Sequence, residues 1–379
     1  MSRLIGVVGA GAMGKGICQL AASSGHQVIV FDKSADALEG LIPKIKGSFS
    51  RLEEKQIQTA EESNSILEKV STTSDINQLA QCGLVIEAIV EDLDLKKAVF
   101  RDLDGLTSPD CILATNTSSL YVGQIASACK NSERVIGLHF FNPVSRMELV
   151  EVVKAVQSAE SYLETAEQIM QSWGKTTVRV SDSPGFVVNR VARPFYSESL
   201  KIYEERLADF ATIDWALKEL GGFKMGPFEL MDFIGHDVNL AATTTVFKAL
   251  NNYVRFAPSA VQQKLVSEGK LGRKTGEGFY LYQEEAKKPE PEKDLELGNI
   301  ILTRVVSLIV DEALILLDEN IASSEDIDKA MLKGVNYPKG PISWGQELSY
   351  SKVKTTLENL LKEKSDERYR PSKKLISLC

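Results

Sequence analysis

The chain has 379 residues, 52 of them acidic and 44 basic, and its formal net charge at pH 7 is −8. A modest acidic charge argues against a nucleic-acid partner, which requires a basic face. No apolar stretch approaches the ~20 residues of a membrane span, and the start reads as a strand rather than a signal peptide. At about 150 residues a domain, the length predicts two or three domains.

Five cysteines are scattered along the chain: Cys18, Cys82, Cys111, Cys129 and Cys379. No two stand at metal-ligand spacing, and an odd number is not typical of a disulfide framework. We therefore expect free thiols in a reducing compartment, the cytoplasm, and no metal site.

The first apolar run, residues 4–8, predicts a buried parallel strand, and helical spacing over residues 12–24 predicts the helix that follows. The turn between them is G-x-G-x-x-G, formed by Gly9, Ala10, Gly11, Ala12, Met13 and Gly14. Between a strand and a helix this pattern is typical of dinucleotide binding, because the glycines permit a tight turn, close approach of the pyrophosphate and close helix–strand packing. The helix N-terminus then attracts the phosphates.

A second strand, residues 28–31, ends at Asp32, about twenty residues further on. A carboxylate there accepts hydrogen bonds from the ribose hydroxyls and repels a 2′-phosphate, so we predict NAD rather than NADP. Lys33 follows and softens that choice slightly. The alternative is a glycine-rich turn beside an aspartate with no special role.

Later apolar runs at 84–86, 112–114 and 135–138 alternate with helical segments. This alternation predicts a mostly parallel sheet covered by helices, an α/β Rossmann-like domain. A long, charged, helix-like insertion lies between Asp32 and Val70. By charge alone it is a solvated helical hairpin, although connections of this length are often functional.

After Val180 the chain becomes mainly helical, and a polar stretch over 284–294 reads as a linker. The helical part contains an internal repeat at one constant offset, which pairs Arg190 with Arg304, Glu198 with Glu312, Asp214 with Asp328 and Pro227 with Pro341. A run of such pairs in register indicates a duplicated module. The second copy lacks a counterpart of LGRKTGEGFYLY (271–282).

The predicted organisation is therefore an NAD-binding domain, residues 1–184, followed by two tandem all-α C-terminal domains, residues 185–284 and 295–379. We predict that residues 190–282 pack against 296–379 with pseudo-twofold symmetry. The chain is then a monomer with an internal pseudo-dimer of helical domains, or an ordinary homodimer.

His139 is the best candidate base among three histidines, because it follows an apolar run at the sheet edge where ligands bind. An imidazole takes a hydroxyl proton near neutral pH and then benefits from a carboxylate neighbour. Residues 147–154 read as a further strand after the turn at Asn142-Pro143, and a hairpin-like return would bring Glu151 back beside His139. Glu148 competes for that place. A hydrogen-bonded core histidine is the alternative.

Two further polar residues follow predicted element ends. Ser118, in TNTSSL (115–120), is a candidate for binding substrate oxygen or cofactor, with a helix N-cap as the alternative. Asn189, in PGFVVNR (184–190), has an amide suited to a substrate carbonyl, and its counterpart in the second copy is Thr303. We interpret the second copy as structural.

With these motifs in hand, the chain resembles the L-3-hydroxyacyl-CoA dehydrogenases, including the 3-hydroxybutyryl-CoA and 3-hydroxyadipyl-CoA enzymes. The resemblance rests on GAGAMG, EAIVED (87–92), NTSSL, GLHFFNP (137–143), SPGFVVNR, MGPFELMD (225–232) and LGRKTGEGFY. It implies NAD-dependent oxidation of a (3S)-3-hydroxyacyl-CoA, an acyl-CoA substrate, in fatty-acid or aromatic-acid degradation.

The resemblance also implies roles for single residues. His139 is the base, Glu151 rather than Glu148 its carboxylate partner, and Ser118 and Asn189 the substrate-positioning pair. The implied cofactor contacts are Gly9, Gly11, Ala12, Met13, Gly14, Asp32, Glu91, Lys96, Ser118, Asn142 and Lys274. The implied coenzyme A contacts are Ser48, Lys55 and Ser118, which favours a function for the charged insertion.

Three rival interpretations remain. One is a dehydrogenase of the 3-hydroxyisobutyrate and 6-phosphogluconate group, which resembles this chain in the glycine loop but uses a lysine, and GLHFFNP argues against it. The second is a dehydrogenase of a 3-hydroxy acid without coenzyme A. The third is an inactive structural or binding protein such as lens lambda-crystallin, against which His139, Glu151 and Asn189 argue.

Overall fold

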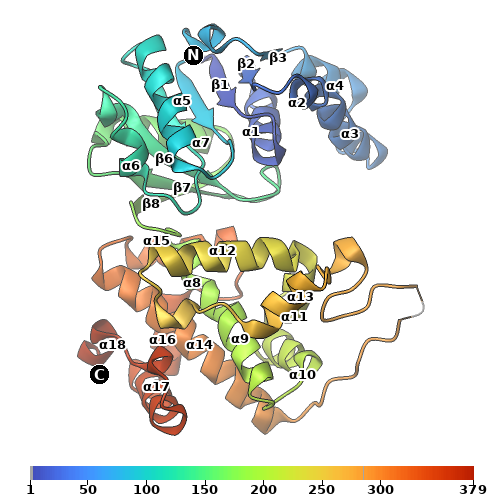
Figure 1. Cartoon of the computed structure of the whole chain (residues 1–379), viewed down its shortest axis with the longest axis vertical. Helices are drawn as coiled ribbons and strands as arrows, with labels where there is room; N and C mark the ends of the chain where they lie inside the picture. Colours follow the sequence, from blue (N-terminus) through green and yellow to red (C-terminus); the bar gives the residue numbers. More distant parts are fainter. Residues whose placement is uncertain (1–2, 285) are drawn as a thin grey trace. The chain divides into compact units, whose positions relative to one another are not determined.

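The structure is a computed structural model that describes residues 3–284 and 286–379. The chain forms two compact units, the first ending at Ser183 and the second beginning at Pro184 (Figure 1). The first is an α/β unit and the second is helical. None of the helices in the described ranges is long and apolar enough to span a membrane.

The first unit is built on one eight-stranded sheet with the order β3-β2-β1-β4-β5-β6-β7-β8. Its strands are β1 (Ile5–Val8), β2 (Val28–Phe31), β3 (Val70–Thr73), β4 (Leu84–Glu87), β5 (Ile112–Thr115), β6 (Val135–Phe140), β7 (Leu149–Lys154) and β8 (Thr176–Ser181). The strands from β3 to β6 pair in parallel, whereas β7 runs antiparallel to β6. The first six strands therefore have the Rossmann order, which confirms the predicted fold class.

Helices cover both faces of this sheet (Figure 1). They are α1 (Ala12–Ser23), α2 (Ala35–Glu39), α3 (Leu41–Glu54), α4 (Ala60–Leu67), α5 (Leu93–Leu106), α6 (Val122–Ala126) and α7 (Glu160–Ser172). Buried side chains of α1, α3 and α7 form one core with alternate residues of the strands. On the opposite face, Val122 of α6 packs over Gly137 of β6.

The predicted strands and first helix lie where the apolar runs placed them, within one or two residues at each end. Two strands, β3 and β8, were not predicted. They are the sheet's two edges, and their sequences, VSTT and TTVRVS, are polar or alternate. An edge strand needs no continuous apolar run, so this signal is weak there.

The charged insertion is a helical hairpin of α3 and α4, as its sequence predicts. Thr59 and Glu62 form a capping box at the start of α4. The inner face of α3 buries Leu41, Ile45 and Phe49 in the core. Its polar face stays available for a ligand.

The second unit contains helices from both copies of the repeat (Figure 1). The first copy contains α8 (Val188–Val191), α9 (Arg193–Glu204), α10 (Phe210–Trp215), α11 (Pro227–Ile234), α12 (His236–Ala249) and α13 (Ala260–Ser267). The second contains α14 (Leu295–Asp318), α15 (Ser324–Gly334), α16 (Pro341–Leu348), α17 (Tyr350–Lys364) and α18 (Lys373–Ser377). The helices α11 and α12 begin at positions that the repeat pairs with the starts of α16 and α17.

Buried ion pairs cross between the two copies in equivalent positions. Arg190 lies 3.0 Å from Glu312, and its counterpart Arg304 pairs with Glu198, the counterpart of Glu312. Arg190 also contacts Glu319 at 2.7 Å, and Arg304 contacts Glu205 at 2.8 Å. Reciprocal contacts of this kind define a pseudo-twofold axis, the packing that the repeat predicts.

Both copies lie within the second compact unit, Pro184–Cys379. Most of the polar stretch 284–294 has no regular structure, and residue 285 lies outside the described residues. Glu292 in this stretch donates its backbone N–H to Thr212. The division into two C-terminal domains at this stretch stays a prediction.

Candidate active site

The glycine-rich turn has the geometry that its sequence requires. Gly9 has a φ of +107°, and a Cβ there would lie 2.6 Å from the Ala88 carbonyl oxygen. A Cβ on Gly14 would lie 1.8 Å from the Gly9 carbonyl oxygen, so helix and turn touch directly. In contrast, a Cβ on Gly11 would meet nothing within 4 Å. Gly9 and Gly14 therefore serve the fold, and the backbone at Gly11 is open to a ligand.

The N-terminus of α1 fits a pyrophosphate. Its N-cap Gly11 provides no side-chain hydrogen bond, and its first turn holds no acidic residue within the described structure. The first N–H groups of a helix have no intrahelical partner and attract anions. Ala12 and Met13 supply these groups here.

Asp32 lies directly after β2 and beside the glycine turn. One carboxylate oxygen accepts the backbone N–H of Ala10 at 2.7 Å, and the other accepts that of Ser34 at 2.9 Å. An ionised carboxylate has about four acceptor positions, so two remain for ribose hydroxyls. These contacts fit NAD at this edge of the sheet.

A buried charged cluster supports the neighbouring strand ends. Lys96 is 1% exposed and its Nζ lies 2.6 Å from Glu87 Oε1 and 3.3 Å from Glu91 Oε2. Burial alone raises the pKa of the Glu91 carboxyl, but Lys96 and hydrogen bonds from three residues of the segment 117–119 bring it below its usual range. Lys96 thus holds Glu91 ionised, and a direct contact between Lys96 and the cofactor stays a prediction.

Ser118 lies in a loop that Glu91 organises. Glu91 Oε1 accepts the Ser118 backbone N–H at 3.0 Å and the hydroxyls of Thr117 and Ser119 at 2.6 and 2.8 Å. The following helix α6 begins at Val122, so Ser118 is not its N-cap. The N-cap alternative is therefore wrong, and the Ser118 side chain is partly exposed at the carboxyl end of β5.

His139 and Glu151 form a buried pair. They stand directly opposite in the antiparallel pairing of β6 and β7. The Nδ1 atom of His139 lies 2.6 Å from Glu151 Oε2, with side-chain exposures of 7% and 0%. Glu148 precedes β7 and is exposed, so the strand register brings Glu151 and not Glu148 to His139.

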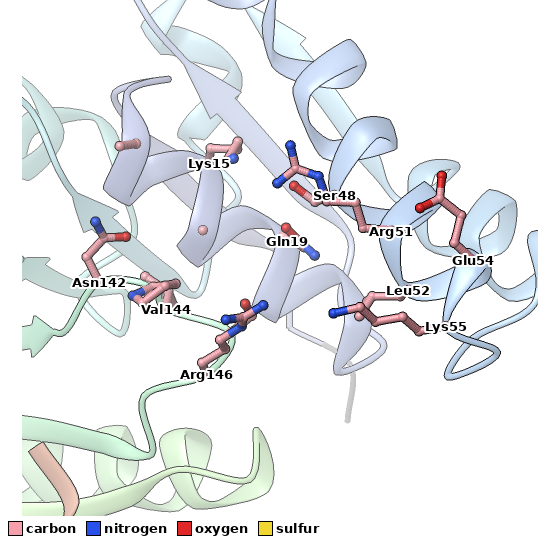
Figure 2. Close-up of a pocket in the computed structure, with 14 residues that line it drawn as sticks. Lys15, Gln19, Ser48, Arg51, Leu52, Glu54, Lys55, Asn142, Val144 and Arg146 are labelled. Carbon is pink, nitrogen blue, oxygen red and sulfur yellow. The ribbon is translucent and has the colours of Figure 1, made fainter. Parts of the chain in front are cut away.

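A cleft of about 470 Å³ opens between α1, α3 and the loop that joins β6 to β7. Ser48 and Lys55 line it from α3 and its C-cap, and Asn142 lines it from the loop. Figure 2 shows Lys55 and Arg146 reaching into the cleft from opposite sides. The lining contains four basic side chains, Lys15, Arg51, Lys55 and Arg146, and one acidic side chain, Glu54. The cleft is therefore suited to an anionic ligand.

The β6–β7 loop is held firmly beside this cleft. The Lys175 Nζ atom donates to the carbonyl oxygens of Val144 at 2.6 Å and Met147 at 2.7 Å. Burial lowers the pKa of this ammonium, and Glu148 opposes the shift. On the other side Val144 packs against Gly16 of α1. The loop thus links the cofactor helix, the cleft and the His139–Glu151 pair.

Two predicted site residues belong to the second unit. Asn189 is partly exposed on α8. Lys274 follows Gly272 and its Nζ lies 2.5 Å from Asp237 Oδ1. Their contribution to the site of the first unit stays a prediction.

Sequence reasoning missed Glu87, Thr117, Lys175 and the basic group of Lys15 and Arg146. Glu87 and Thr117 lie within or beside recognised motifs, but their roles depend on which side chains face each other. Their positions in the sequence could have indicated both residues as site candidates: Lys15 directly follows the glycine turn, and Arg146 follows Asn142.

Two family models match nearly the whole chain. Residues 4–183 match the NAD binding domain of 3-hydroxyacyl-CoA dehydrogenase. Residues 185–282 and 300–379 match the C-terminal domain of the same family.

Comparison with individual known proteins points to the same family. The chain is 37% identical to 3-hydroxyadipyl-CoA dehydrogenase of Escherichia coli over 97% of this chain and 95% of that protein. It is 38% identical to mitochondrial hydroxyacyl-coenzyme A dehydrogenase of Sus scrofa over 73% of this chain and 90% of that protein. A solved structure of 3-hydroxybutyryl-CoA dehydrogenase from Escherichia coli matches with a TM-score of 0.92 and 36% identity, covering 100% of this chain and 98% of that one. The chain belongs to the 3-hydroxyacyl-CoA dehydrogenase family and is an oxidoreductase of that family.

Proposed function

We propose that the protein oxidises a (3S)-3-hydroxyacyl-CoA to the 3-ketoacyl-CoA with NAD as the hydride acceptor. The observation that carries this proposal is the buried pair of His139 and Glu151, 2.6 Å apart at the carboxyl end of β6. Oxidation of a secondary alcohol needs a base beside the cofactor site, and this pair supplies one.

His139 removes the hydroxyl proton in this scheme. Since Glu151 holds Nδ1, the proton goes to Nε2, which makes the ring an imidazolium. The Glu151 carboxylate fixes the ring orientation and stabilises the positive charge, as a carboxylate does in an acid–base triad. When bound, NAD accepts the hydride from the substrate carbon.

Ser118 and Asn189 position the substrate oxygens. Glu91 accepts the Ser118 backbone N–H and thereby holds the loop that carries the Ser118 hydroxyl. We assign NAD contacts to Gly9, Gly11, Ala12, Met13, Gly14, Asp32, Glu91, Lys96, Ser118, Asn142 and Lys274. The open backbone at Gly11 and the acceptor positions of Asp32 support this assignment.

The basic cleft of the first unit binds the coenzyme A phosphates. Ser48 and Lys55 belong to this site, and the charges of Arg51 and Arg146 extend it. A cluster of four cations with one carboxylate raises the local concentration of a polyanionic substrate.

The assay for this function is NADH consumption with 3-ketoacyl-CoA thioesters of four to ten carbons, with NADPH as a second reductant. We expect turnover with NADH and much slower turnover with NADPH. Absence of NADH consumption with every thioester of the series contradicts the proposal. The names of the relatives differ in acyl chain, hydroxyadipyl in one and hydroxybutyryl in the other, so the series also measures chain preference.

We further infer that the protein is a monomer located in the cytoplasm. The crossed ion pairs bury the reciprocal contact between the two helical copies within a single chain, which supports the first inference. The five cysteines are free, which suits a reducing compartment. Light scattering tests the first inference, since the mass of one chain supports it and the mass of two refutes it.

A further inference from the structure

The described residues of the second unit include five buried arginines, and one of them differs from the rest. Arg190, Arg255, Arg304 and Arg368 each contact two carboxylates. Arg193 is 6% exposed and contacts no carboxylate within the described parts of the chain. A buried charge without a counter-charge is costly, so its retention requires a reason.

The contacts of Arg193 are all neutral. Its Nε atom donates to the Asn189 carbonyl oxygen at 3.0 Å, and Nη1 donates to the Thr243 hydroxyl at 3.1 Å. Its guanidinium lies 5.0 Å from the centre of the Tyr196 ring. Burial lowers the pKa of Arg193, and the Tyr196 and Tyr337 hydroxyls only partly oppose that shift. Within residues 3–284 and 286–379, the surroundings of Arg193 therefore supply no negative charge to its guanidinium.

A second polar group beside Arg193 is also unsatisfied. The Tyr337 hydroxyl is buried, and no hydrogen-bond partner for it lies among the described residues. The tyrosine packs on the rings of Phe195 and Phe223, which fix its position. An unpartnered hydroxyl next to an uncompensated cation forms a site for an anion, because both donate hydrogen bonds to it.

The duplicated module gives an internal comparison. The repeat pairs Arg193 with Ser307, Tyr196 with Val310, and Thr243 with Leu357. The second copy therefore keeps the helices and lacks the cation and both neighbours. Packing of the module does not require Arg193, which indicates a role specific to the first copy.

The location of Arg193 indicates which anion it binds. It lies one helical turn after Asn189, on the same face, and is hydrogen-bonded to that residue's carbonyl group. Asn189 is the residue that positions the substrate carbonyl in the proposed function, on which this inference rests. We propose that Arg193 and the Tyr337 hydroxyl bind a carboxylate at the far end of the acyl chain, so that the preferred substrate is a dicarboxylic acyl-CoA.

The test compares two ketoacyl thioesters of equal length, 3-ketoadipyl-CoA, which ends in a carboxylate, and 3-ketohexanoyl-CoA, which ends in a methyl group. The measured quantity is the ratio of their kcat/KM values for NADH oxidation. We expect the wild type to prefer the carboxylate. Loss of a charge-assisted hydrogen bond lowers this ratio by roughly 10- to 100-fold in Arg193→Met. Loss of the hydroxyl alone, in Tyr337→Phe, lowers it by about threefold to tenfold.

Ser307→Ala is the matched control, because Ser307 occupies the equivalent position in the second copy, and its ratio should equal that of the wild type. Folding is checked by thermal unfolding. Arg193→Met removes a charge that contacts no carboxylate among the described residues and should not lower Tm, whereas Arg304→Met breaks two ion pairs and should lower it. If Arg193→Met fails to fold, the ratio in Tyr337→Phe decides.

The inference is overturned by an unchanged ratio in Arg193→Met, or in Tyr337→Phe if Arg193→Met does not fold. The inference is also overturned if the wild-type protein prefers the thioester that ends in a methyl group. It is overturned as well if the substitutions change only the KM for NADH. A wild type that consumes no NADH with either thioester instead contradicts the proposed function.

Discussion

Replacing Glu151 with glutamine tests the role of the buried carboxylate at constant size. Glu151 is fully buried and its Oε2 atom lies 2.6 Å from His139 Nδ1. In the native site Nδ1 donates its proton to the carboxylate, and Nε2 is left as the base. A glutamine amide that donates to Nδ1 reverses this tautomer, and it no longer stabilises an imidazolium.

Both consequences lower the rate of the chemical step. General-base catalysis contributes about 10²–10⁴ in rate, which corresponds to about 3–5 kcal/mol of the barrier. Replacing the buried aspartate of an acid–base triad with asparagine, which also turns a carboxylate into an amide, lowers kcat by about 10⁴. Because the pair is nearly inaccessible to water, we expect Glu151→Gln to lower kcat by about 10²–10⁴ with little change in the KM for NADH.

Steady-state NADH consumption with acetoacetyl-CoA measures this effect, and circular dichroism checks that the variant is folded. Glu148→Gln is the matched control, since Glu148 is exposed outside the strand register and its loss should leave kcat close to wild type. Near-wild-type turnover of Glu151→Gln refutes the assigned role, and so does an equal loss in both variants.

Four further substitutions test the cofactor site, the coenzyme A site and the pH dependence of stability. Asp32→Ala removes the carboxylate that accepts the Ala10 N–H and the ribose hydroxyls. The KM for NADH should therefore rise about tenfold, and the preference for NADH over NADPH should shrink. An unchanged ratio of kcat/KM for NADH to kcat/KM for NADPH contradicts this. Arg51→Ala and Arg146→Ala should each raise the KM for acetoacetyl-CoA several-fold at low salt but not the KM for an N-acetylcysteamine thioester, which lacks the nucleotide. Glu91→Gln tests the pH dependence of stability. The pKa of Glu91 is lowered in the folded state, so the ionised carboxylate stabilises the folded protein at neutral pH. This contribution to stability is lost as the pH falls through the lowered pKa. The Tm difference from wild type should therefore be larger at neutral pH than in acid, and an equal difference at both is the opposing result.

Sequence patterns predicted the first unit well because its signals are local. The roles of the turn Gly9–Gly14 and of Asp32 follow from local sequence, because they need only a strand, a tight turn and a helix in succession. The structure shows the turn and Asp32 in the predicted arrangement. Apolar runs located the central strands because parallel strands buried on both faces must be apolar. The edges β3 and β8 carry no such requirement.

The remaining features depend on contacts between distant segments. Residue types alone could not choose between Glu148 and Glu151, because a shift of one residue in strand register reverses which face a side chain occupies. The significance of Arg193 lies in the lack of a carboxylate around it in the described parts of the chain, which only tertiary structure reveals. The repeat was visible in the sequence, but the exchange of ion pairs between its copies required knowledge of their packing.

The most direct test of the account is NAD reduction by 3-hydroxybutyryl-CoA, measured separately for the two enantiomers in the wild type and in His139→Gln. The account predicts NADH formation by the wild type with the (3S) enantiomer, little with the (3R) enantiomer, and a rate at least about 10² lower in His139→Gln. Wild-type rates in His139→Gln, or no NADH formation from the (3S) enantiomer, contradict the central claim that the His139–Glu151 pair carries out alcohol oxidation.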